Sequence, residues 1–162
     1  MDKLAIERAL TDYAAAWRLN QAAALPPFWD SAHFAFYKAE EVTRFFTDFA
    51  ETLAYWQQNQ GLHDDIRLTL GPITAVPVAD GIAMAMFDMN WDIRFAAEAK
   101  LANGQDFHHR GKAMGGFNHV LAMLRQGESG WKLIGWSETP DAAITYLTQL
   151  YYRTVAEDFR PS

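Results

Sequence analysis

The sequence contains no cysteine, so disulfide bonds, thiolate metal sites and cysteine nucleophiles are excluded. It also has no excess of basic residues: 14 Lys and Arg accompany 20 Asp and Glu, which gives a net charge of −6. Proteins that bind nucleic acid or anionic membranes neutralise phosphate groups with Lys and Arg. We therefore expect neither nucleic acid nor a membrane surface as the main partner.

Long apolar segments and the signature motifs of several enzyme classes are missing as well. No apolar run reaches the roughly 18–20 residues of a membrane-spanning helix, and the charged start at residues 1–8 is unlike a signal peptide. There is no phosphate-binding glycine loop, no G-x-S-x-G nucleophile elbow and no H-E-x-x-H zinc motif. We therefore expect a cytoplasmic protein without nucleotide, serine-hydrolase or zinc-protease chemistry, and neither a cofactor nor a metal.

Aromatic and other apolar residues are abundant. Half of the 162 residues are hydrophobic, and the chain carries 11 Phe, 6 Trp and 6 Tyr. A chain of this length and composition forms a domain of ordinary size with a sizeable core. Because no repeat or charge block divides the sequence, we expect residues 1–162 to form a single domain.

Helical periodicity dominates the first half of the chain. Apolar residues recur at helical spacing over residues 2–19, which predicts a first helix. A longer apolar stripe predicts a second helix over residues 39–60, which Gly61 ends. After the strands described next, Pro140 and Asp141 open an added C-terminal helix over about residues 141–160.

In the second half of the chain, apolar and polar residues alternate with the period of two that is typical of strands. Strands are predicted over residues 66–70, 73–78, 82–95, 107–125 and 131–138.

In the strand over residues 82–95, every odd position is apolar, whereas the even positions turn polar from Asp88 onward. One face of this strand is therefore buried along its whole length. Gly115-Gly116 predicts a bend or β-bulge in the next strand. Helices followed by long antiparallel strands predict an α+β fold, in which a strongly curved sheet wraps around a helical layer and leaves a concavity.

Several local sequences occur in a recognisable order. The first helix contains Tyr13 to Trp17, the segment Phe28-Trp29-Asp30 follows it, and the last strand begins with Gly130 to Ile134. This layout resembles the nuclear-transport-factor-2-like superfamily, which includes SnoaL-like polyketide cyclases, ketosteroid isomerases and scytalone dehydratases. The resemblance covers about residues 3–140. It implies a conical α+β barrel with one deep apolar pocket, often a homodimer through the outer face of the sheet.

The resemblance also suggests roles for particular residues. In ketosteroid isomerases a tyrosine of the first helix helps to form the oxyanion hole, and Tyr13 falls in the matching place. The general-base aspartate of those enzymes would fall near residues 36–38, where this chain has Phe-Tyr-Lys and no carboxylate. Scytalone dehydratases use tyrosines and histidines around a water. This chain has residues of these types that are candidates for the same role: Tyr13, Tyr37, His109 and His119.

The position of each histidine on its strand predicts the face to which its side chain points. His108 and His109 are adjacent, so on a strand they point to opposite faces and cannot chelate one metal together. His109 shares its face with Phe107 and Ala113, which predicts that it points inward. There it is either a general acid or base or a hydrogen-bonded core histidine. His119 faces the pocket or a dimer partner, depending on whether the glycine pair forms a bulge.

Most of the carboxylates are expected to lie at the surface. Asp88 and Asp92 lie opposite the apolar face and are expected to pair with Arg110 or Lys112 of the next strand, unless a bulge turns Asp88 inward. Glu138 is a further candidate at the rim of the cone, where a surface position is expected. His63 is assigned to a solvated loop.

Several aromatic side chains are expected to line the pocket, although most of the aromatic residues must form core. The ligand-binding candidates are Trp17, Trp29, Tyr37, Phe49, Trp56, Phe87 and Trp91, together with His119.

Two hypotheses for function follow. The first is a SnoaL-like, cofactor-free cyclase, dehydratase or isomerase acting on a small apolar or cyclic molecule, in which His109 moves the proton and Tyr13 hydrogen-bonds a developing oxyanion. The second is a non-catalytic ligand-binding or dimerisation module. The missing isomerase base favours the second hypothesis, and an inward His109 favours the first.

Overall fold

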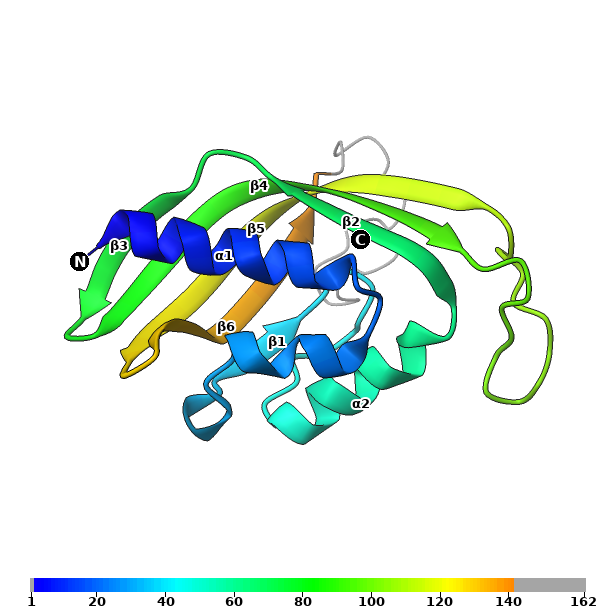
Figure 1. The fold of residues 1–162 in the computed structure, drawn as a ribbon, viewed down its shortest axis with the longest axis horizontal. Helices are drawn as coiled ribbons and strands as arrows, with labels where there is room; N and C mark the ends of the chain where they lie inside the picture. The colour runs from blue at the N-terminus through cyan, green and yellow to red at the C-terminus, as the bar shows by residue number, and fades with distance from the viewer. Residues whose placement is uncertain (1, 142–162) are drawn as a thin grey trace, which may run out of the picture.

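The computed structural model describes residues 2–141, in which helices pack against one curved, mixed sheet (Figure 1). The helices are α1 (Lys3–Trp17) and α2 (Phe49–Gln60), with short 3-10 turns at η1 (Ala22–Ala24), η2 (Pro26–Phe28) and η3 (Ser31–His33). The strands are β1 (Phe36–Lys38), β2 (His63–Leu70), β3 (Thr74–Ala79), β4 (Ile82–Phe95), β5 (Ala113–Gly127) and β6 (Gly130–Pro140). The predicted C-terminal helix lies outside the described residues.

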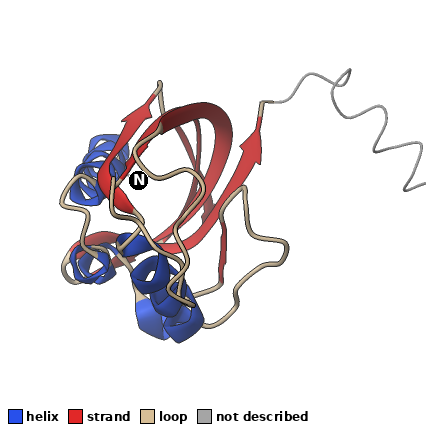
Figure 2. Cartoon of the chain, turned by 90° about the vertical axis from the view of Figure 1, so that its right-hand side faces the viewer, coloured by secondary structure: helices blue, strands red, loops and turns tan. Residues whose placement is uncertain are grey.

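The order of the strands explains the shape of the sheet. Within residues 2–141 the strands follow the order β1-β6-β5-β4-β2, and β3 pairs with the part of β4 that β2 leaves free. All pairings are antiparallel except that of β1 with β6. In Figure 2 the long strands curl into an incomplete ring whose open side the helices cover. The predicted α+β class, with helices on a strongly curved sheet, is confirmed.

The core lies between α1 and the concave face of the sheet. The inward side of α1 contributes Ile6, Leu10 and Tyr13, each no more than 1% exposed. The odd positions of β4 face them, as the alternation predicts: Ala83, Ala85, Phe87 and Met89 are all buried. No helix of the described residues is both long enough and apolar enough to span a membrane.

The second helix is shorter than the apolar stripe predicts. It begins at Phe49 instead of Ala39, because Asp48 caps it by accepting a hydrogen bond from the Ala50 amide at 2.7 Å. Upstream, the backbone of Phe46 exchanges two hydrogen bonds of 2.9 Å with Tyr37 and so extends the sheet locally. The expectation of a continuous helix over residues 39–60 is therefore wrong, and residues 39–48 form an irregular segment beside β1.

The strand β5 also differs from its prediction. It begins at Ala113 instead of Phe107, and its pairing with β4 runs without a register shift from Ala113 to Arg125. Gly115 and Gly116 therefore form no bulge. Gly116 instead allows the indole of Trp91 to pack directly over the strand, because a Cβ at this position would lie 2.6 Å from that indole.

A bulge occurs in β6 instead. Met123 pairs with Gly135 while Leu124 pairs with Leu133, so Ile134 is an extra residue in the last strand. Leu133 is buried on the inner side before the bulge, and Trp136 is buried after it. The bulge thus changes the phase of the alternation and brings Glu138 onto the same side as Trp136.

Candidate active site

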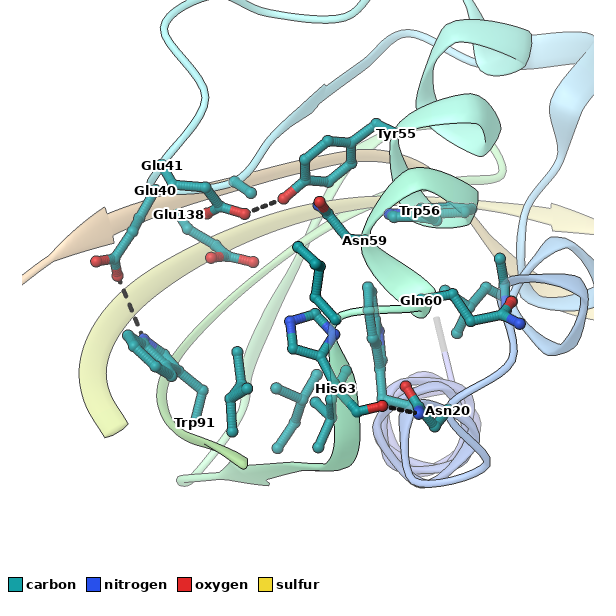
Figure 3. Close-up of a pocket in the computed structure, with 18 of the residues that line it drawn as sticks. Asn20, Glu40, Glu41, Tyr55, Trp56, Asn59, Gln60, His63, Trp91 and Glu138 are labelled. Carbon is teal, nitrogen blue, oxygen red and sulfur yellow. Dashed lines mark hydrogen bonds between the residues drawn. The ribbon is translucent and has the colours of Figure 1, made fainter. Parts of the chain in front are cut away.

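A cavity of about 350 Å³ lies between α2, the end of α1 and the concave face of the sheet (Figure 3). Its walls are mostly apolar, with Leu68 and Met89 from the sheet and Leu25 from the η1–η2 region. A mostly apolar concave space that also contains polar groups is typical of sites that bind small molecules.

Four of the aromatic residues predicted to bind a ligand line this cavity. They are Trp17, Tyr37, Trp56 and Trp91. Trp56 and Tyr37 are each only 3% exposed, and their rings meet edge to face at 5.4 Å. Two walls of the cavity are thus formed by rings from α2 and β1.

Three other predicted pocket residues lie outside the cavity wall. Trp29, 3% exposed, packs against Phe49 at 6.1 Å in the core below α2, and Phe87 packs against Trp136 at 5.7 Å. Their rings therefore support the site without facing it.

Tyr13 also lies in the core and not on the cavity wall. Its ring lies among those of Trp17, Phe28, Trp29 and Trp136, at 5.4–6.2 Å between centroids. Its buried hydroxyl has no hydrogen-bond partner among residues 2–141, and burial raises the pKa of this phenol. The geometry gives Tyr13 no access to a molecule in the cavity.

The structure does not place His109 at the site either. It lies in the turn before β5 and not on a strand, and its ring stacks on Phe95 at 5.8 Å and meets Phe107 edge-on at 5.5 Å. The expectation that His109 points into the pocket is wrong, because the residues before Ala113 do not take part in the alternation of β5.

His119 lies on the outer face of the sheet. It pairs in register with Asp88, and its Nδ1 lies 2.8 Å from the carboxylate of that residue. The Asp88 side chain is 54% exposed, so the surface assignment of this carboxylate is confirmed. The expected pairing with Arg110 or Lys112 is wrong, because Asp92 pairs with Arg67 of β2 and Arg110 pairs with Asp106.

Glu138 is the carboxylate that faces the cavity. Trp136 donates its indole N–H to Oε1 at 2.6 Å, and the Asn118 amide donates to Oε2 at 3.0 Å. Asn118 is fully buried and reaches Glu138 from β5, because the bulge in β6 has aligned both side chains on the inner face. The expected surface position of Glu138 is therefore wrong.

The environment of Glu138 changes its protonation. Burial raises the pKa of this carboxyl to about 7, and the nearby carboxylates of Glu41 and Glu40 act in the same direction, against the hydrogen bond from Trp136. Near neutral pH Glu138 therefore populates both its protonated and its ionised form, as a general acid or base requires.

Glu40 and Glu41 bring two more carboxylates to this end of the cavity (Figure 3). Glu40 accepts a hydrogen bond from the Trp91 indole at 3.3 Å, and Glu41 accepts one from the Tyr55 hydroxyl. The carboxyl of Glu41 loses hydration on the cavity side, which raises its pKa although the residue as a whole is exposed. Both residues belong to the segment that was expected to be helical.

His63 lies on another part of the cavity wall. It begins β2, its carbonyl accepts a hydrogen bond from the Asn20 amide at 2.7 Å, and its ring packs on Phe95 at 5.4 Å. Burial lowers the pKa of this imidazole, so it is neutral at pH 7. The assignment of His63 to a solvated loop is wrong.

Tyr37 is a further polar group on the cavity wall. Within residues 2–141, no group of three or more His, Cys, Asp or Glu residues is arranged to hold a metal ion. Tyr37 lies beside Glu138 in the adjacent strand, paired with Trp136, and burial raises the pKa of its hydroxyl well above the ordinary value. Tyr37 therefore remains a neutral hydrogen-bond donor next to a titrating carboxyl.

The comparisons with known proteins concern the fold. No protein-family model and no curated protein matches the sequence. Among solved structures, a provisionally assigned NTF2-like dehydratase from Streptomyces avermitilis superposes with a TM-score of 0.67 at 15% identity, over 85% of this chain and 94% of that chain.

Two further solved structures are similar. A provisionally assigned scytalone dehydratase from Novosphingobium aromaticivorans has a TM-score of 0.68 at 12% identity, over 85% of this chain and 83% of that chain. A hexachlorocyclohexane dehydrochlorinase, LinA type 2, has a TM-score of 0.65 at 10% identity, over 86% and 85%. The chain therefore has the nuclear-transport-factor-2-like fold that its sequence predicts.

Proposed function

We propose that this protein is a cofactor-free lyase or isomerase that removes a proton from a small apolar molecule, with Glu138 as the general base. The observation that carries the proposal is a carboxyl with a pKa of about 7 that faces an apolar cavity. General bases work best when their pKa lies near the working pH. The dehydratase and dehydrochlorinase assignments of similar folds support this reaction class.

The chemistry follows from the positions of Glu138 and Tyr37. The Glu138 carboxylate takes a proton from a carbon next to a carbonyl group, and the electron pair of the broken C–H bond moves onto the carbonyl oxygen. The neutral Tyr37 hydroxyl donates a hydrogen bond to that developing charge. In an isomerisation the proton returns from Glu138 to another carbon; in a dehydration it joins the departing hydroxide to form water. Either route regenerates the carboxylate.

Isotope exchange tests the proposal without knowledge of the natural substrate. The ring ketone 2-tetralone in D₂O reports proton abstraction through the loss of its α-proton NMR signals. We expect the protein to accelerate exchange, with a rate that rises through about pH 7 as Glu138 ionises. Glu138→Gln should lower the accelerated rate by about 10²-fold or more.

A matched control separates the site from the surface. Glu128 lies exposed in the turn between β5 and β6, so Glu128→Gln should exchange at the wild-type rate. The proposal fails if Glu138→Gln exchanges as fast as the wild type, or if the wild type does not exceed Glu138→Gln at any pH.

We also propose that two copies of the chain associate through the outer face of the sheet. That face carries exposed apolar side chains from adjacent strands, including Met86 and Leu121, which are 38% and 36% exposed and pair in register. An open groove runs beside them, bordered by Phe36 and Phe45. A second copy would cover apolar area that otherwise remains in contact with water.

A further inference from the structure

The three carboxylates at one end of the cavity lack a basic partner within residues 2–141. Glu138 is bonded to Trp136 and Asn118, Glu40 to Trp91, and Glu41 to Tyr55. All of these donors are neutral. The charged residues that line the described cavity wall are these three glutamates, and no Lys or Arg among residues 2–141 lines it.

Other carboxylates of the protein form ion pairs with arginine side chains. Asp30, Asp64 and Asp92 each lie within 3.0 Å of an arginine nitrogen. Lys38 is the basic residue nearest in sequence to Glu40 and Glu41, and its ammonium group donates to the carbonyl of Ala39 at 2.7 Å. Its charge partly offsets that of Glu41 without an ion pair between the side chains. The acidic end of the cavity therefore retains negative charge.

The walls next to this acidic end are suited to a cation. The indoles of Trp91 and Trp56 and the ring of Tyr55 border the cavity, and the faces of aromatic rings attract ammonium groups. The indole N–H of Trp56 is itself fully buried and lies toward the Tyr37 hydroxyl, so it does not reach a molecule in the cavity.

We propose that the cavity binds an apolar molecule that carries a protonated amine, with the ammonium group between Glu41 and Glu138. This inference deepens the proposed function, because it names the substrate class of the same site. The ammonium group supplies the positive charge that the three carboxylates lack, whereas an anionic molecule of the same shape meets their repulsion.

A matched series of small molecules tests this charge preference. Cyclohexylmethylamine, cyclohexylmethanol and cyclohexanecarboxylate have similar ring bodies and carry a positive, neutral and negative group. Binding is measured at pH 8 by isothermal titration calorimetry with the full chain. We expect the amine to bind at least 10-fold more tightly than the alcohol, and the carboxylate to bind more weakly than both.

Charge removal identifies the residues responsible. Glu41→Gln should lower the preference for the amine over the alcohol by about 5-fold or more, and Glu128→Gln should leave it unchanged. The preference should also fall between pH 8 and pH 5.5 as Glu138 takes up a proton. The titratable groups around Glu138 are Glu40, Glu41, Tyr37 and Tyr13. Tyr55 and His63 lie on other parts of the cavity wall.

The inference is overturned if the alcohol binds as tightly as the amine at pH 8, if Glu41→Gln keeps the full preference, or if none of the three molecules binds. These outcomes are distinct from failure of the proposed function. Loss of the charge preference with exchange still dependent on Glu138 would leave proton transfer in place with a neutral substrate. A charge preference without such exchange would indicate an amine-binding protein.

Discussion

At the scale of single residues, Glu138 links the stability of the protein to pH. Its pKa is about 7 in the folded protein against an ordinary value of 4.5, so the folded state holds the proton more tightly than the unfolded state. The resulting stabilisation is complete below about pH 4.5 and is lost as the pH rises through about 7. The difference corresponds to about 3 kcal/mol at most.

Glu138→Gln should therefore change the pH profile of stability. The amide carries no charge to desolvate, so the variant should gain stability relative to the wild type at pH 8 and lose most of that advantage at pH 4.5. Asn118 has a buried amide oxygen without a partner, and by turning over it can accept a hydrogen bond from the new amide. Thermal unfolding between pH 4.5 and 8 measures the effect; parallel profiles of the two proteins would contradict it.

Residue types in the sequence identified part of the site. Trp17, Tyr37, Trp56 and Trp91 were predicted to line a pocket because a domain of this size rarely needs so many large rings, and they do line one. Glu138 was recognised as a carboxylate candidate but placed at the surface, because the alternation from Trp131 onward does not reveal an extra residue at Ile134. The Trp-x-Glu pattern over residues 136–138 was the available signal, since a carboxylate two residues from a buried tryptophan shares its face.

At the scale of elements, β4 and β5 form a continuous pair in which glycine makes room for Trp91. Gly116→Ala would place a Cβ 2.6 Å from that indole, so the ring would have to move away from the strand and into the cavity. We expect a loss of about 1–3 kcal/mol in the free energy of unfolding and a smaller cavity. Chemical denaturation followed by tryptophan fluorescence measures both stability and the environment of the ring.

Gly61→Ala is the matched control for this prediction. Gly61 ends α2 with φ −74°, and a Cβ there would meet no atom within 4 Å. Its stability should remain within about 0.5 kcal/mol of the wild type. Equal stability of Gly116→Ala and Gly61→Ala would show that Trp91 does not pack on this part of β5.

Element boundaries were predicted well where periodicity and capping agree. The first helix and β4 lie close to their predicted ranges, because each has a long regular pattern. The segment over residues 39–48 was assigned to a helix because Val42, Phe45 and Phe46 have helical spacing. Phe46 instead joins Tyr37 in backbone pairing, which a local pattern does not report.

At the scale of the whole molecule, the proposed dimer is tested on the outer face of the sheet. Leu121→Glu would place a charge beside Met86 on the outer face of the sheet, where burial against a second copy would be costly. We expect the wild type to be a dimer at micromolar concentration and the variant to be a monomer, as measured by light scattering after size exclusion. Leu101→Glu is the control, because Leu101 is similarly exposed, at 38%, but lies in the loop after β4. A monomeric wild type, or a variant that remains dimeric, would contradict the proposal.

The class of the fold, the buried face of β4 and the aromatic character of the cavity follow from local periodicity and composition, and the sequence predicted them. Which polar groups enter the cavity depends on how distant strands pair. Glu138 enters because one extra residue shifts the phase of β6, while His109 is excluded because β5 begins only at Ala113. Such positions depend on hydrogen-bond register between strands distant in the sequence, and a change of one residue moves a side chain to the opposite face of the sheet.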